Sequence, residues 1–287
     1  MKNQGSFVLE LCMFLFSRLG QTTYAWKPTV LAPFSRPSVS CRKISKSHLF
    51  TTMAPDSSTS TDPLTQRGLP SPLILGSASF TRKLILKEMG IPYHILVRPI
   101  DEKGLGDRSR DIPADLVLTL GKAKMLHLVD EIKAGRCQKE IEESFGTDES
   151  GTHMIVLTGD QVVTCDGEIL EKPESIEEAR SFVSRYGRTP PSTVGSCVLT
   201  HLPSGIQVSG TDTATIHFKV DTPATLVDKL VAKGEPILSC AGGLMVEHPD
   251  VKEYVASIDG TEDSVMGLSK DLVIRLLDDL ALKLNRS

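Results

Sequence analysis

Apolar and polar residues alternate in a regular pattern only from about residue 73 onward. Short apolar runs typical of buried strands occupy residues 73–75, 93–97, 154–157, 194–200, 206–209 and 213–218. Elsewhere apolar residues recur every three or four positions, which predicts amphipathic helices over residues 81–89, 113–132, 176–186, 222–233 and 269–284. Strands that alternate with helices predict a single α/β domain from about residue 70 to residue 287.

Several boundaries of these elements carry local signals. Ser175 and Glu178 have the spacing of a capping box at a helix start, and Gly187 is a typical helix end. The sequence Pro203-Ser204-Gly205 predicts a hairpin turn between two of the strands. Residues 133–152 are polar and contain glycine, so we expect a surface insertion there.

The first 62 residues have a different composition. Positions 1–60 hold seven Lys and Arg residues but only two acidic ones, although the whole chain has a net charge of −4. The segment is rich in Ser and Thr and is interrupted by prolines. Such a basic, acid-poor leader is typical of transit peptides and is poorly suited to build a packed core. We therefore expect residues 1–62 to be a disordered leader or a plastid or mitochondrial transit peptide.

Other interpretations of this leader stay open. The apolar run at residues 7–16 suits the centre of a secretory signal, but Glu10 interrupts it. The run is also shorter than the roughly 20 residues that span a bilayer, so we expect no integral membrane protein. Met53 offers a downstream start that would give a cytoplasmic form, and an untargeted tail is a further alternative.

The charge and the cysteines of the remaining chain exclude two classes of function. Its net charge is negative, which disfavours binding to nucleic acid polymers because that binding depends on Lys and Arg contacts to phosphates. The six cysteines of the whole chain are widely separated and show no zinc-binding spacing, so we expect reduced, unpaired thiols. A polyanionic ligand would have to be bound by a few local cations.

Residues 76–82 connect the first predicted strand to the first predicted helix. Free backbone N–H groups and the positive dipole end of a helix start bind anions, and Ser77, Ser79 and Arg82 would add hydrogen bonds. The segment therefore predicts a phosphate site, although it lacks the Gly-Lys-Ser/Thr of a Walker A loop. The alternative is that Ser79 only caps the helix and Arg82 is solvated.

Charged residues elsewhere in the chain could take part in the hydrolysis of a phosphoanhydride. Asp160 follows an apolar strand, and Glu102 is a second carboxylate of the kind that binds a divalent cation or accepts a proton from water. Lys122 and Lys172 would each be an ordinary surface lysine if taken alone. Together with Arg82, these residues supply the cations and carboxylates that hydrolysis of a phosphoanhydride requires.

The order and spacing of several motifs resemble those of the Maf-like nucleotide pyrophosphatases over roughly residues 72–285. These motifs are Ser77-Ala78-Ser79-Phe80-Thr81-Arg82, Asp101-Glu102, Gly121-Lys122-Ala123-Lys124, Gly159-Asp160-Gln161-Val162-Val163, Asp166-Gly167-Glu168-Ile169-Leu170-Glu171-Lys172-Pro173, Ala241-Gly242-Gly243 and Val265-Met266-Gly267-Leu268. The resemblance implies an α/β fold related to the inosine-triphosphate pyrophosphatases. That fold has a mixed central sheet flanked by helices, two lobes with a cleft between them, and a possible homodimer.

The resemblance also implies an activity and roles for individual residues. The activity is house-cleaning hydrolysis of a nucleoside triphosphate to the monophosphate and pyrophosphate with a divalent metal cation, Mg²⁺ or Mn²⁺. Asp160 matches the proton acceptor that activates water, and Glu102 matches a carboxylate that assists the metal or the water. The groups that match the ligands of the triphosphate are Ser77, Arg82, Lys122 and Lys172, with Ser79 in the same motif.

The family has one branch that acts on dTTP and UTP and another that acts on 7-methyl-GTP. Gln161 and Glu247 resemble the second branch, whereas Thr81 stands where the second branch usually has Trp and the first has Arg. We therefore expect 7-methyl-GTP or another modified or non-canonical nucleotide as substrate. The alternative is a nucleotide-binding regulator of cell division or growth without significant turnover.

Overall fold

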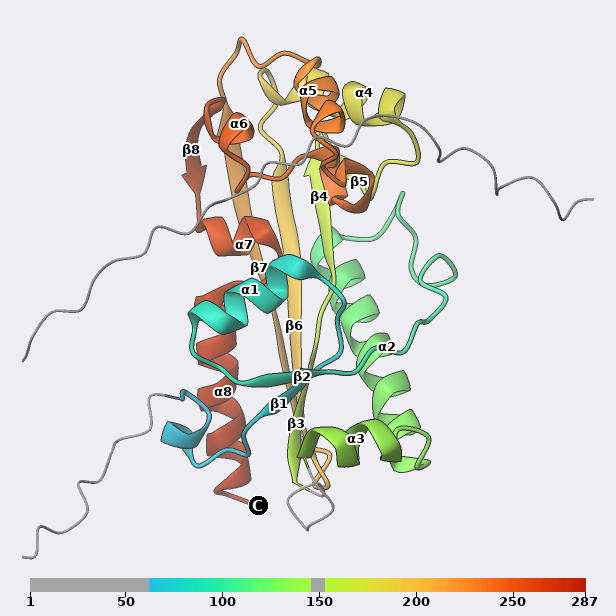
Figure 1. The fold of residues 1–287 in the computed structure, drawn as a ribbon, viewed down its shortest axis with the longest axis vertical. Coiled ribbons are helices and arrows are strands. Elements are labelled where there is room, and N and C mark those ends of the chain that lie inside the picture. The colour runs from blue at the N-terminus through green and yellow to red at the C-terminus, as the bar shows by residue number, and fades with distance from the viewer. Residues whose placement is uncertain (1–61, 146–152) are drawn as a thin grey trace, which may run out of the picture. The chain divides into compact units, whose positions relative to one another are not determined.

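The computed structural model describes residues 62–145 and 153–287 (Figure 1). The leader predicted over residues 1–62 therefore lies outside the described residues except for its last position, and so does the end of the insertion predicted at 133–152. Within the described part of the chain, no helix combines the length and the apolar character needed to cross a bilayer.

The described residues form one mixed sheet, which confirms the predicted fold class. Its strand order is β2-β1-β3-β6-β4-β5, with β7 paired to β6 and β8 paired to β7. β1 runs parallel to β2 and β3, and the other pairings are antiparallel. The strands are β1 Leu73–Leu75, β2 Tyr93–Ile95, β3 Met154–Thr158, β4 Gln161–Cys165, β5 Glu168–Leu170, β6 Ser192–Leu202, β7 Gln207–Phe218 and β8 Val255–Asp259.

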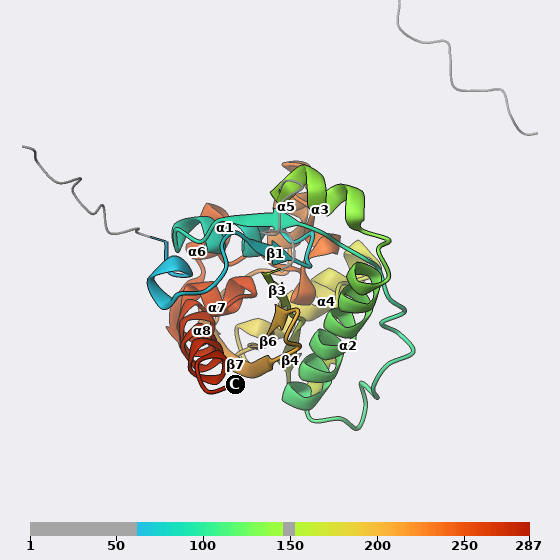
Figure 2. The same ribbon diagram turned by 90° about the horizontal axis from the view of Figure 1, so that it is seen from below.

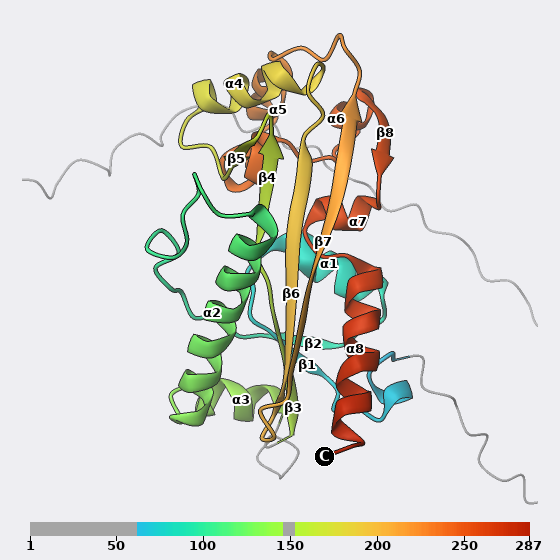
Figure 3. The same cartoon turned by 180° about the vertical axis from the view of Figure 1, so that it is seen from behind.

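The helices cover both faces of this sheet. Ile155 and Leu157 of β3 pack in a cluster with helix α8, whereas Met154 and Val156 pack on the opposite face with residues of α2. Figure 2 shows α2 and α8 on either side of β6, and Figure 3 shows α4 and α5 at the far end of the long strands. The helices are α1 Phe80–Glu88, α2 Pro113–Lys133, α3 Gln138–Phe145, α4 Ile176–Tyr186, α5 Leu226–Ala232, α6 Pro249–Lys252, α7 Glu262–Met266 and α8 Lys270–Leu284.

The predicted boundaries of α1, α2, α4 and α8 agree with the observed ones within one residue, whereas α5 begins at Leu226, four residues later than predicted. Ser175 caps α4 by accepting a hydrogen bond from the backbone N–H of Glu178 at 3.1 Å, as the capping pattern predicts. Part of the predicted surface insertion forms α3, in which Ile141 is buried. The packed part of the domain also begins before residue 70, because Leu64 and Leu69 are buried in the same cluster as α8.

The eleven-residue strand β6 connects the two ends of the sheet. β3 pairs with its second half, at residues 198–202, and β4 pairs with its first half, at residues 192–195. β3 and β4 therefore pair with the same side of β6 in near succession, interrupted only by Gly159 and Asp160. The backbone N–H of Ser196 donates to the carbonyl of Asp160 at 2.8 Å, which keeps this interruption attached to β6.

Candidate active site

Asp160 lies between β3 and β4, where the strand that pairs with β6 changes from one to the other. The backbone of Gly159 passes so close to β6 that a Cβ atom there would be 2.1 Å from the carbonyl oxygen of Ser196. Only glycine fits this contact. The backbone N–H of Asp160 donates to Oγ of Ser196 at 3.0 Å, and the carboxylate side chain is 12% exposed. The strand break thus fixes a nearly buried carboxylate in the middle of the sheet.

Helix α2 packs directly over this break. Oγ of Ser196 donates to the carbonyl of Val117 at 2.7 Å, and Oγ1 of Thr158 donates to the carbonyl of Gly121 at 2.8 Å. A Cβ atom on Gly121 would be 2.7 Å from Oγ of Ser196, so the absence of a side chain allows the close approach. The residue one turn after Gly121 on this face is Lys124.

Lys124 brings the two predicted carboxylates together. Its Nζ lies 2.6 Å from Oδ1 of Asp160 and 3.1 Å from Oε1 of Glu102. The Lys124 side chain is 18% exposed and that of Glu102 is 47% exposed, so the cluster extends from the interior to the surface. The contact with Asp160 is a charge-assisted hydrogen bond, and the contact with Glu102 is an ion pair.

Arg82 is buried beside this cluster and connects three segments. One terminal nitrogen donates to Oγ of Ser77 at 3.2 Å and to the carbonyl of Gly159 at 2.9 Å, while Nε donates to the carbonyl of Gly267 at 3.0 Å. Burial lowers the pKa of the Arg82 guanidinium, and the nearby carboxylate of Asp160 acts in the opposite direction. An arginine held in this way stays protonated. It therefore places positive charge at the start of α1.

The Ser-rich turn before α1 has the predicted form. Ser79 is the N-cap of α1 and accepts a hydrogen bond from the backbone N–H of Arg82 at 3.4 Å. Oγ of Ser77 accepts from the backbone N–H of Ser79 at 3.2 Å. The hydroxyl of Thr81 lies 2.9 Å from that of Ser79. Ser79 is thus a cap, as the alternative held, while Arg82 is buried and not solvated.

Three of the predicted residues lie apart from the contacts of Lys124. Lys122 is exposed on α2, and among the described residues the ion pairs of Asp160 and Glu102 are made by Lys124. Lys172 is exposed just after β5, and both it and Glu247 act electrostatically on the thiol of Cys240. The structure therefore does not bring Lys122, Lys172 or Glu247 into contact with Asp160.

The position of Lys124 could have been found from helix periodicity. Val117, Gly121 and Leu128 are the buried residues of α2 that precede and follow it at intervals of three or four. Lys124 continues this stripe, whereas Lys122 points to a different side of the helix. The resemblance instead matched Lys122, two positions before the lysine that contacts the carboxylates.

Gln161 has a structural role beside the site. Its Nε2 donates to the carbonyl of Val265 at 2.8 Å and to that of Ser264 at 3.4 Å. Ser264 and Val265 belong to α7, and Gly267 follows directly after this helix. The carbonyl of Gly267 accepts a hydrogen bond from Nε of Arg82. Gln161 and Arg82 therefore both donate hydrogen bonds to carbonyls at the C-terminal end of α7.

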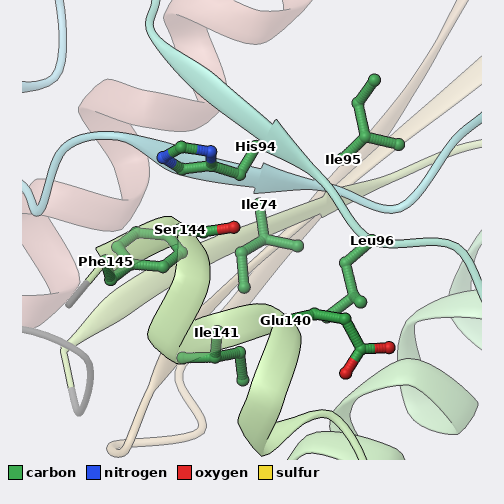
Figure 4. Close-up of a pocket in the computed structure, with 8 residues that line it drawn as sticks. All are labelled: Ile74, His94, Ile95, Leu96, Glu140, Ile141, Ser144 and Phe145. Carbon is green, nitrogen blue, oxygen red and sulfur yellow. The ribbon is translucent and has the colours of Figure 1, made fainter. Parts of the chain in front are cut away.

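A small pocket lies elsewhere, between the edge strand β2 and helix α3 (Figure 4). Its walls are mainly aliphatic and aromatic. The rings of His94 and Phe145 pack edge to face with their centroids 5.0 Å apart. The carboxylate of Glu140 at its rim is 2.6 Å from a terminal nitrogen of Arg98. No Lys or Arg lines the pocket among the described residues, so it does not suit a polyphosphate.

This chain is similar in sequence to several known proteins. The sequence profile of the Maf-like protein family matches residues 72–280. A protein of Dictyostelium discoideum named 7-methyl-GTP pyrophosphatase is 34% identical over 73% of this chain and 98% of its own length. A nucleoside triphosphate pyrophosphatase of Nocardia farcinica is 29% identical over 74% of this chain and 94% of its own length. A dTTP/UTP pyrophosphatase of Salinibacter ruber is 28% identical over 75% and 93%, respectively.

Proposed function

Because the chain belongs to the Maf-like protein family, we propose that it is an enzyme that hydrolyses nucleoside triphosphates to the monophosphate and pyrophosphate. The observation that carries this proposal is the convergence of Lys124, Asp160 and Glu102 beside the buried Arg82. Two carboxylates next to two cations, at the start of a helix, are the groups that phosphoanhydride hydrolysis requires.

Asp160 is the proton acceptor in this proposal. Its carboxylate is nearly buried, and the backbone on both sides of it is fixed by β6. The Lys124 ammonium at 2.6 Å orients one carboxylate oxygen and leaves the other to accept a proton from water. The same ammonium would offset negative charge that develops on the phosphate. We accordingly assign to Lys124 the role that the resemblance gave to Lys122.

A divalent cation fits the residues present. Asp160 and Glu102 supply the carboxylate oxygens that Mg²⁺ and Mn²⁺ prefer, and both reach the same ammonium group. Among the described residues no three His, Cys, Asp or Glu side chains form a full metal site. Mg²⁺ commonly takes only one or two carboxylates and completes its shell with water and substrate phosphates. When bound, the cation would neutralise charge on the phosphates.

The start of α1 is the proposed phosphate site. Arg82 donates hydrogen bonds to the carbonyl of Gly159 and to the hydroxyl of Ser77. These bonds fix the position of the Asp160 carboxylate relative to the first backbone N–H groups of α1. Ser77 and Ser79 already form hydrogen bonds within the turn, and their hydroxyls can rotate to donate to phosphate oxygens. We propose that Lys172 approaches the outer phosphates from its exposed position.

We propose 7-methyl-GTP as the preferred substrate. The name of the Dictyostelium relative supports this choice, and the half-buried carboxylate of Glu247 suits a cationic 7-methylguanine ring. Thr81 would contribute a hydroxyl, which Ser79 contacts, in place of a stacking ring.

The test is release of pyrophosphate from a panel that contains 7-methyl-GTP, GTP, UTP, dTTP and inosine triphosphate, with Mg²⁺ or Mn²⁺. We expect turnover of at least one nucleotide and a higher kcat/KM for 7-methyl-GTP than for GTP. Tight nucleotide binding without any product, from folded protein, would favour a regulator without turnover. Glu247→Gln should lower kcat/KM for 7-methyl-GTP more than for UTP.

We also propose that residues 1–62 direct the chain to a plastid or a mitochondrion, supported by their basic, Ser/Thr-rich composition. A form that starts at Met53 should then stay in the cytoplasm. Fluorescence imaging of the full chain beside the shorter form tests this. Identical distributions of the two forms would contradict the proposal.

A further inference from the structure

Glu102 lies on the long connection between β2 and α2, and most side chains of this connection are exposed. From Asp101 to Ile112, only Leu105 and Arg108 are not exposed. Leu105 packs against the apolar cluster formed by α2 and its neighbouring strands, which anchors the middle of the connection. A single apolar side chain cannot fix the position of a carboxylate three residues away, so other contacts must determine where Glu102 lies.

The backbone N–H of Leu105 donates to the carbonyl of Glu102 at 3.2 Å, and Arg108 adds side-chain contacts to the same connection. Its guanidinium donates to the carbonyl of Glu102 at 2.9 Å and also to the carbonyl of Leu105. The terminal nitrogen that contacts Glu102 lies 3.3 Å from Oε1 of Glu171, at the end of β5. The planar fork of arginine suits this arrangement because it can bind several acceptors in fixed directions, which lysine cannot do. Arg108 thus joins the Glu102 connection to a separate part of the fold.

The backbone of Glu171 is well anchored, although its side chain is 48% exposed. Its carbonyl accepts a hydrogen bond from the backbone N–H of Gly242 at 3.1 Å, and the carbonyl of Gly242 accepts one from the Tyr186 hydroxyl at 2.6 Å. Tyr186 is buried and stacks on Phe218 with ring centroids 5.5 Å apart. A continuous set of contacts therefore runs from the Glu102 backbone through Arg108 and Glu171 to the core around α4.

The neighbouring ion pair does not offer the same support. Lys103 and Glu174 also connect the two segments at 3.3 Å, but their side chains are 86% and 81% exposed. An exposed pair of this kind contributes little, since water competes for both groups. The Arg108 side chain is only 22% exposed and binds two carbonyls as well as a carboxylate.

We propose that Arg108 is a positioning residue for the reaction. It holds the Glu102 carboxylate at the Lys124 and Asp160 cluster and sets the distance from that cluster to Lys172, which directly follows Glu171. This inference rests on the proposed function, because Glu102 is taken to act on the metal or the water. Loss of a residue that orients a metal-binding carboxylate commonly weakens metal affinity or activity by about 10-fold to 100-fold.

The experiment compares Arg108→Ala with Arg110→Ala in the full chain. Arg110 lies on the same connection, and its side chain is 85% exposed and contacts only the local Asp107 at 3.7 Å among the described ion pairs. Two readouts are taken: the Mg²⁺ concentration for half-maximal pyrophosphate release, and the amide hydrogen exchange of residues 100–112 without nucleotide. For Arg108→Ala we expect a Mg²⁺ requirement raised about tenfold or more and faster exchange. For Arg110→Ala both should match wild type.

Glu171→Gln supplies a second variant that leaves Arg108 in place and reproduces the effect if the link acts through Glu171. The double variant should then be no worse than Arg108→Ala alone, because the two residues act as one unit. Equal behaviour of Arg108→Ala and Arg110→Ala would overturn the proposal, and so would faster exchange with an unchanged Mg²⁺ requirement. If wild type releases no pyrophosphate, the proposed function fails, while the exchange data still decide whether Arg108 holds the connection.

Discussion

The ammonium group of Lys124 lies 2.6 Å from the carboxylate of Asp160, although the two residues are 36 positions apart in the sequence. The contact exists because Ser196 hydrogen-bonds both the backbone of Asp160 and the carbonyl of Val117 on α2. One serine on the central strand thus aligns the helix that carries the cation with the strand break that carries the acid. The backbone positions of β6 and α2 therefore determine how close the two charged groups lie.

Replacement of Lys124 by methionine should abolish most of the activity. The change leaves Asp160 and Glu102 close together without the cation between them, so their charges repel, and it removes a cation near the phosphate. We expect kcat/KM to fall by about 10²-fold to 10³-fold. The matched control is Lys122→Met on the exposed side of the same helix, which should stay within about twofold of wild type. Equal losses in both variants would assign the role to neither lysine.

Asp160→Asn tests the proton acceptor. The amide keeps the size of the side chain but cannot take a proton from water, so the chemical step should slow by about 10²-fold to 10⁴-fold. Nucleotide binding, measured by calorimetry, should persist. Circular dichroism and the melting temperature verify the fold. A variant that keeps more than half of the wild-type kcat would remove Asp160 from the mechanism.

Gly121→Ala tests the close contact between α2 and β6. The added Cβ would lie 2.7 Å from Oγ of Ser196 and 3.3 Å from a methyl group of Val198. The helix must then move away from the strand, which should lower the free energy of unfolding by about 1–3 kcal/mol. Urea unfolding measures the loss. Lys122→Ala, at the adjacent exposed position, should be neutral. Alanine forms helix better than glycine or lysine, so helix propensity cannot explain a loss, and an unchanged or higher stability of Gly121→Ala would contradict the contact.

We expect His201 to contribute to the pH dependence of the free energy of unfolding. Burial lowers the pKa of His201 below its ordinary value of 6.5, and the nearby His153 acts in the same direction. The folded protein therefore binds a proton at His201 less readily than the unfolded chain does, so the stability from the neutral ring is lost as pH falls below about 6.5. Urea unfolding between pH 7.5 and 5 should show a smaller decrease for His201→Gln than for wild type. Parallel curves for the two proteins would contradict this expectation.

Local signals in the sequence were sufficient for most elements. The capping Ser175, the apolar stripe of α2 and the turn at Ser204 depend on neighbouring residues, and each appears where the pattern predicts it. Helix α3 was not predicted because its short, highly charged sequence resembles a surface loop, and only the packing of Ile141 and Cys137 reveals it. The leader before residue 62 lies outside the described residues and stays a prediction.

The sequence by itself determined the α/β class, the strand–turn–helix around Arg82 and the carboxylates Asp160 and Glu102, since each depends on local pattern or on motif order. The choice of Lys124 over Lys122, and the link from Arg108 to Glu171, were decided only by the tertiary structure. Both depend on how a helix or a connection packs against strands that are distant along the chain. For Lys124 this packing depends on the close fit of Gly121 and Gly159 to β6, which local sequence patterns do not reveal.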